Sequence, residues 1–173
     1  MYRAIFVTLF IFISFSINPY VSAQVNNLSK ELLKKEIDNY GEKLTNKIPS
    51  SYSKEDARKN GDVIFFKHKS TFENKKIKQF IYNVKNNKPD FIRFVEFTSK
   101  GDPVITEYQF NGKLIYYRYD SSRDRSDQYR KGTFAMGKFI KAPQVLEDYC
   151  KKLVYNSKMS YLTNCYHFDK VEF

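Results

Sequence analysis

The clearest alternation of apolar and polar residues runs from Gly101 to Asp124 and is centred on Asn111-Gly112. Asn-Gly between two alternating runs is typical of a two-residue type I′ hairpin turn, because both central residues of that turn have positive φ. Such a turn pairs Phe110 with Lys113. One face of this predicted hairpin then carries six apolar side chains, from Val104, Tyr108, Phe110, Ile115, Tyr117 and Tyr119.

The other face of the hairpin mixes charged and apolar residues. Glu107 and Arg118 fall diagonally across the predicted ladder, near enough to form an ion pair. The same face also carries Ile105, Gln109, Leu114, Tyr116 and Asp120. The pattern therefore predicts a sheet with one core face and one mixed face.

The N-terminal part shows helical rather than strand periodicity. From Leu28 to Leu44 the apolar residues predict an amphipathic helix, followed by a linker around Pro49. Ser53-Lys54-Glu55-Asp56 resembles a capping box that opens a short helical turn, and Gly61 stops that turn.

A second long helix is predicted from Glu73 to about Asn87, between strands at Val63–Lys69 and Phe91–Thr98. Its buried stripe consists of Ile77, Phe80, Ile81 and Val84. Lys75 and Lys78 lie off this stripe. The strand at Phe91–Thr98 has apolar residues on both faces, which indicates a central position in the sheet.

Apolar residues resume at Phe134–Ile140, and residues 150–165 read as a final hairpin. If Ser157-Lys158 centres its turn, Cys150 lies opposite Cys165, and the same register pairs Leu153 with Leu162 and Val154 with Tyr161. In an oxidising compartment this register predicts a disulfide.

Helices followed by a run of antiparallel strands predict an α+β fold: a helix packed on an antiparallel β-meander, an additional N-terminal helix and a disulfide-closed C-terminal hairpin. We divide the chain into a signal peptide (1–23), an N-terminal amphipathic helix with linker (24–52) and a single α+β domain (53–173). The length suits one domain with its own core.

The first residues predict secretion. Arg3 precedes an apolar run, and Val21-Ser22-Ala23 is a small-residue cleavage site, so we expect cleavage between Ala23 and Gln24. Ser14 to Pro19 interrupt the apolar run too early for a membrane span. Cleavage removes one charge from the formal net charge of +11. The remaining excess favours anionic partners such as nucleic acid, a wall polymer or lipid headgroups, or it serves only solubility.

Several short motifs occur in order: Asn60-Gly61-Asp62-Val63, Gly101-Asp102-Pro103-Val104-Ile105, Asn111-Gly112-Lys113, Tyr119-Asp120-Ser121-Ser122-Arg123-Asp124, Lys131-Gly132 and the late cysteine pair. In this order they resemble a family of small secreted proteins and lipoproteins of Gram-positive spore-forming bacteria, catalogued as a domain of unknown function. The resemblance covers roughly Ser53 to Cys165 and implies no activity. Many members resemble lipid-anchored proteins, whereas this chain has no cysteine near the cleavage site.

The polar loop after the central hairpin is the best candidate binding site. Its candidate residues are Tyr119, Asp120, Arg123, Asp124, Arg130 and Lys131. Arginine forks there could bind a phosphate or carboxylate. The competing interpretation is structural: Asp120 and Ser121 cap a turn, and Arg123 and Asp124 pair with each other within it. Lys75 and Lys78 belong to a second candidate surface, since residues 67–88 contain seven lysines and one acid.

Other chemistry has little support in the sequence. His68 and His167 evoke an acid–base pair acting on a phosphodiester, but nothing in the pattern brings them together. The spacing of the loop aspartates differs from a calcium loop, and zinc would lack ligands if the cysteines are oxidised. No nucleophile elbow is present. We therefore expect no catalytic residue, metal or cofactor.

These observations favour a secreted, monomeric, non-catalytic binding or accessory module for an anionic polymer or a protein partner at the cell envelope. The alternative is a small secreted enzyme acting on a phosphodiester or cell-wall polymer. A third possibility is a protein that masks an enzyme through an exposed sheet face.

Overall fold

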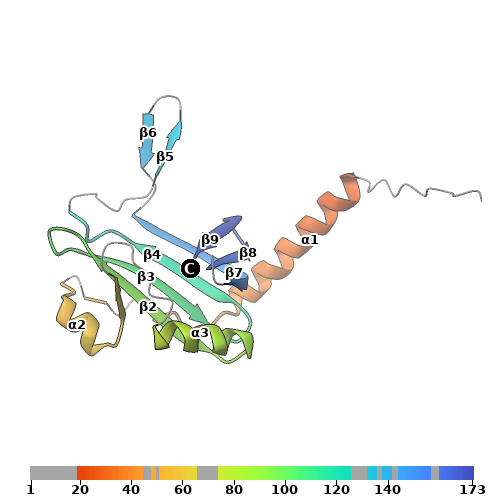
Figure 1. Ribbon diagram of the computed structural model, residues 1–173. Coiled ribbons are helices and arrows are strands. Elements are labelled where there is room, and N and C mark those ends of the chain that lie inside the picture. The colour runs from red at the N-terminus through yellow and green to blue at the C-terminus, as the bar shows by residue number, and fades with distance from the viewer. Residues whose placement is uncertain are drawn as a thin grey trace, which may run out of the picture.

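The computed structural model describes residues 19–173 except 45–47, 50, 66–73, 126–131, 136–137, 142–143 and 157–159, and it describes no side chains for 19–28, 132–135 and 138–141. The elements, drawn in Figure 1, are α1 (Pro19–Asp38), α2 (Lys54–Lys59), β1 (Val63–Phe65), α3 (Lys75–Lys85), β2 (Asp90–Phe97), β3 (Pro103–Phe110), β4 (Ile115–Asp120), β5 (Gly132–Ala135), β6 (Lys138–Lys141), β7 (Val145–Tyr155), β8 (Ser160–Cys165) and β9 (Lys170–Glu172).

Seven strands form one curled sheet in the order β1-β2-β3-β4-β7-β8-β9, and β5 pairs with β6 as a separate ribbon that projects from it (Figure 1). The chain is mostly β with a few helices, which agrees with the predicted α+β class. The prediction of an antiparallel meander is wrong at one edge of the sheet, where β1 pairs with β2 in parallel. The connection between them contains α3, and such a crossover returns the chain to the same end of the sheet.

The main core lies between α3 and one face of the sheet (Figure 1). All six residues predicted for the core face of the central hairpin are buried there: Val104, Tyr108, Phe110, Ile115, Tyr117 and Tyr119. The ring of Phe173, directly after β9, stacks on Phe80 of α3 and meets Phe94 and Tyr108 edge-on. The C-terminal residue therefore packs on β2 and β3, although β9, the strand just before it, lies at the other edge of the sheet.

The other sheet face, predicted to be mixed, is covered at two places. Leu33 of α1 and Tyr40 pack on Leu114 and Tyr116, while Tyr52 and Ala57 of α2 pack on Val95 and Ile105. The segment after α1 is also held by hydrogen bonds to β3. The side chain of Gln109 donates to the carbonyl of Glu42 (2.7 Å) and accepts from the backbone N–H of Leu44 (2.9 Å).

The N-terminal helix differs from the prediction at both ends. It begins at Pro19 rather than Leu28 and ends at Asp38 rather than Leu44, and Gly41 follows with φ of +97°. Only part of the predicted stripe is buried, since Leu32 is 53% exposed. The expected signal-peptide cleavage site lies within α1, and cleavage there stays a prediction. The division of the chain into an N-terminal segment and a domain beginning at residue 53 also stays a prediction.

The capping box predicted at Ser53 is confirmed.

The predicted register of the central hairpin is wrong by two residues. Phe110 pairs with Ile115 instead of Lys113, so the turn is centred on Gly112-Lys113. Only Gly112 has positive φ (+96°), as in type II′ rather than type I′ turns. The reason is Asn111, whose side-chain oxygen accepts the N–H groups of Lys113 and Leu114. A shift of two residues leaves every side chain on its predicted face.

Gly112→Ala should lower the free energy of unfolding by about 1 kcal/mol, because a residue with a Cβ is strained at this φ. Lys113→Ala is the matched control, since Lys113 is exposed and its φ is ordinary. Urea denaturation of both variants measures the effect. Equal unfolding midpoints for the two variants would contradict the turn geometry.

The C-terminal hairpin forms in the predicted register. Cys150 pairs with Cys165, and Leu153 and Val154 pair with Leu162 and Tyr161. The two sulfurs form a disulfide, and the described residues contain no free cysteine. The predicted turn at Ser157-Lys158 lies outside the described residues.

Candidate functional site

In the described part of the loop after β4, the charged side chains bind other groups of the protein. Tyr119 belongs to the main core at 6% exposure, and Asp120 and Asp124 are buried. Arg123 donates to Asp120 (2.7 Å) and, at longer distances, to the backbone carbonyls of residues 48 and 49. Arg130 and Lys131 lie outside the described residues. These contacts favour the structural interpretation of the loop, but Arg123 pairs with Asp120 rather than with Asp124 as expected. Binding of an anion there stays a prediction.

Asp120 organises the loop as an acceptor. One oxygen accepts the backbone N–H (2.9 Å) and hydroxyl (2.6 Å) of Ser122, and the other accepts from Arg118 and Arg123. Burial by itself would raise the pKa of Asp120. The hydrogen bonds from Ser122, the charge of Arg118 and the hydrogen bond from Arg123 outweigh it and lower the pKa below the ordinary value of 3.8.

Asp120→Asn should therefore destabilise the protein in a pH-dependent way. A carboxylate whose pKa is lowered by folding stabilises the fold above its ordinary pKa, and this contribution disappears as pH falls through the folded pKa. We expect a loss of about 1–3 kcal/mol at neutral pH. The difference between parent and variant should shrink below pH 3.8. Urea titrations from pH 7 to pH 2 measure it, and a pH-independent difference would contradict the assignment.

A buried charge network extends from this loop across the covered face of the sheet. Arg93 of β2 donates to Glu107 of β3 (2.7 Å) and lies 3.4 Å from Asp62, which accepts the hydroxyl of Tyr52. Arg118 continues the network to Asp120 (2.9 Å). The ion pair predicted between Glu107 and Arg118 is present as a directly opposed cross-strand pair, at 3.9 Å.

Glu107 is the centre of this network and is fully buried. One of its oxygens accepts from Arg93, whereas Oε2 has no hydrogen-bond partner among the described residues. Burial raises the pKa of Glu107 although both arginines oppose this shift. The sequence pattern did not indicate a role for Arg93. The feature that could have indicated one is a charged residue in a strand that has apolar residues on both faces.

His167 has a carboxylate partner that the sequence did not indicate. Its Nδ1 lies 3.3 Å from Asp148, and the imidazole is 62% exposed. Asp148 is fully enclosed and also accepts the N–H groups of His167 and Phe168. His68 lies outside the described residues, so a pair of histidines is not seen. Asp148 and the two cysteine sulfurs cluster within 4.8 Å, but the sulfurs are bonded to each other.

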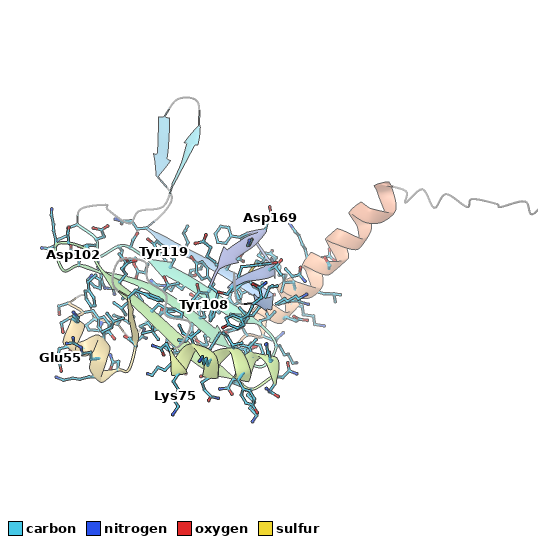
Figure 2. The ribbon with its side chains drawn as sticks, viewed as in Figure 1. Glu55, Lys75, Asp102, Tyr108, Tyr119 and Asp169 are labelled. Atoms are coloured by element: carbon cyan, nitrogen blue, oxygen red, sulfur yellow. A yellow bond between two sulfur atoms is a disulfide. The ribbon has the colours of Figure 1, made fainter. Side chains whose placement is uncertain are left out.

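The exposed side of α3 carries cations without acids. Ile77, Phe80 and Ile81 are buried, as predicted, and α3 contains no acidic residue. We define the lysine face as Lys75, Lys78, Tyr82 and Lys85, all exposed. Figure 2 shows Lys75 on the side of α3 that faces away from the sheet. Among the described residues, no ion pair involves these three lysines.

The lysine face is ordered by the helix beneath it. Asn74 caps the N-terminus by accepting the N–H of Lys76 (2.9 Å), and the ammonium group of Lys76 donates to the carbonyl of Gly61. Lys88, just beyond the helix, places Nζ 5.9 Å from the centre of the Tyr82 ring. A row of cations on a packed helix is suited to bind an anionic surface or polymer.

Comparison with known proteins identifies the family to which this chain belongs. Residues 59–161 match the family described as "Domain of unknown function (DUF4362)", which is more than half of the chain. The chain belongs to this family. No curated protein and no solved structure matches it. The match confirms the predicted resemblance to a family catalogued as a domain of unknown function. It includes α3 and the network from Asp62 to Arg123, but not Tyr52 or Cys165.

Within the part of the chain that the structure describes, no helix is both long and apolar enough to cross a membrane.

Proposed function

We propose that the protein is a secreted, non-catalytic binding module that attaches to an anionic, phosphate-bearing polymer at the cell envelope through the lysine face of α3. The observation that carries this proposal is the exposure of Lys75, Lys78 and Lys85 with no acid on the same helix. The signal-peptide pattern before Gln24 supports an extracellular location.

The lysine face supports binding better than the loop after β4. Among the described residues Lys75, Lys78 and Lys85 form no ion pair, although Lys85 Nζ lies 5.9 Å from the centre of the Tyr155 ring. Lysines without an acidic partner keep their counterions, and an anionic polymer gains affinity by displacing them. Arg118 and Arg123 instead bind Asp120, so an anion would have to break existing charge-assisted hydrogen bonds to reach them. We therefore place the primary contact on α3.

An alternative is an enzyme acting on a phosphodiester, and the observation that favours it is the His167–Asp148 pair. A carboxylate on Nδ1 orients an imidazole, whose exposed side could then transfer a proton. The same contact also anchors the loop between β8 and β9. Incubation with a model phosphodiester separates the two: turnover that His167→Gln abolishes would favour the enzyme.

The salt dependence of binding tests the proposal. With three or four lysines displacing counterions, affinity for inorganic polyphosphate or oligothymidylate should fall by about 20- to 50-fold between 50 mM and 200 mM salt. Fluorescence anisotropy measures it on the oxidised mature chain. An affinity that does not change with salt concentration, or no binding to either polymer at low salt, would overturn the proposal and favour a protein partner.

A further inference from the structure

We propose that the polymer bound by the lysine face is a single-stranded nucleic acid and that Tyr82 stacks on one of its bases. This inference rests on the proposed function and specifies its ligand. The feature that suggests it is an exposed aromatic ring in the middle of a row of cations.

Tyr82 is 54% exposed, although tyrosines on the sheet such as Tyr108 and Tyr116 are almost completely buried. It lies seven residues after Lys75, four after Lys78 and three before Lys85. At these spacings all four side chains share one side of a helix. The ring therefore stands between ammonium groups rather than at the edge of the cationic row.

The dimensions of the row suit a strand with phosphates and bases. Lys75 and Lys85 are ten positions apart, which corresponds to about 15 Å along the helix axis. A single strand crossing this row can place phosphates beside the lysines while a base between them lies on Tyr82. Proteins that bind single strands without sequence preference combine the same two elements, cationic groups for the backbone and aromatic rings for the bases.

Other anionic partners use Tyr82 less well. A membrane-binding helix inserts its apolar face, but the apolar face of α3 is committed to the core through Ile77, Phe80 and Ile81. In a duplex the base faces are already stacked on one another and offer no free face to a tyrosine. A polyphosphate or a polyol phosphate has charges but no flat ring. A single strand uses both the lysines and the ring.

An abasic oligonucleotide isolates the contribution of the ring, because it has the backbone charges of oligothymidylate without its bases. We expect the mature oxidised protein to bind a twelve-nucleotide oligothymidylate about tenfold or more tightly than the abasic oligomer of the same length at 50 mM salt. Tyr82→Ala should bring this ratio close to one, and Tyr82→Phe should retain it. Tyr82 is exposed, so neither substitution disturbs the core.

Each outcome separates the two proposals. A tenfold preference that depends on the ring supports stacking. Equal binding of both oligomers, weakened alike by salt and by Lys75→Glu, would overturn the nucleic-acid inference and leave the anionic-polymer proposal standing. Tight oligothymidylate binding that is unchanged in Tyr82→Ala would also overturn it. No binding of either oligomer at low salt would overturn the nucleic-acid inference, and if polyphosphate also failed to bind, the anionic-polymer proposal would be overturned as well.

Discussion

Arg93→Met should lower the free energy of unfolding by about 3–5 kcal/mol, the typical cost of removing one partner from a buried ion pair. Arg93 is the closest cation to Glu107, and the Glu107 carboxylate is completely buried with one oxygen already without a hydrogen-bond partner. Without Arg93, Arg118 at 3.9 Å is the one cation left in an ion pair with Glu107 in the part of the chain that the structure describes. Urea denaturation at pH 7, followed by circular dichroism, measures the loss.

The double variant Arg93→Met/Glu107→Met provides the matched control. Replacing both partners with apolar side chains of similar size removes the buried charge together with its partner, so we expect much of the lost stability to return. Arg58→Met controls for loss of an exposed arginine, since its ion pair with Glu55 is solvent-exposed and should contribute little. Additive losses in the double variant would contradict the pairing.

Removal of the Cys150–Cys165 disulfide should produce the second large effect. The bond closes a loop of 15 residues, which is worth about 3 kcal/mol in the chain-entropy model. Dithiothreitol should therefore lower the unfolding midpoint of the parent protein. Cys150→Ala/Cys165→Ala should unfold near the midpoint of the reduced parent and should not respond to the reductant. A parent protein whose midpoint is the same with and without reductant would contradict this prediction.

The sequence predicted those parts of the fold in which a local pattern and the packing agree. The stripe of Ile77, Phe80 and Ile81 and the pairing of Cys150 with Cys165 are confirmed, because each pattern fits only one face or register. The faces of the central hairpin are also as predicted. Its turn is not, because Asn111 uses its side chain to accept two backbone N–H groups instead of adopting positive φ.

The features that the sequence did not predict depend on contacts between distant residues. The parallel pairing of β1 with β2 follows from where α3 packs, and a three-residue strand contains too little pattern to indicate it. The network joins Asp62, Arg93, Glu107 and Asp120 over almost 60 positions of the sequence. Charge alternation within one hairpin indicated only Glu107 with Arg118.

The role of the candidate binding loop also could not be predicted from the sequence. Its density of arginines and aspartates could indicate either a ligand site or internal ion pairs, and composition does not distinguish them. In the structure Asp120 binds Arg118 and Arg123. The sequence signal for a cationic face on α3 was simpler, because residues 67–88 contain seven lysines and one acid, so most of these lysines have no acid nearby in the sequence.

Charge reversal on α3 is the most direct test of the proposed binding surface. Lys75→Glu/Lys78→Glu should weaken binding of oligothymidylate or polyphosphate at 50 mM salt by about tenfold or more and should flatten its salt dependence. Lys59→Glu/Lys100→Glu is the control: both residues are exposed, lie on α2 and the β2–β3 turn, and change the net charge equally. The account predicts that the α3 variant loses far more affinity than the control, with unchanged unfolding midpoints in both. Equal losses in the two variants would show that net charge rather than the lysine face drives binding, and would contradict the account.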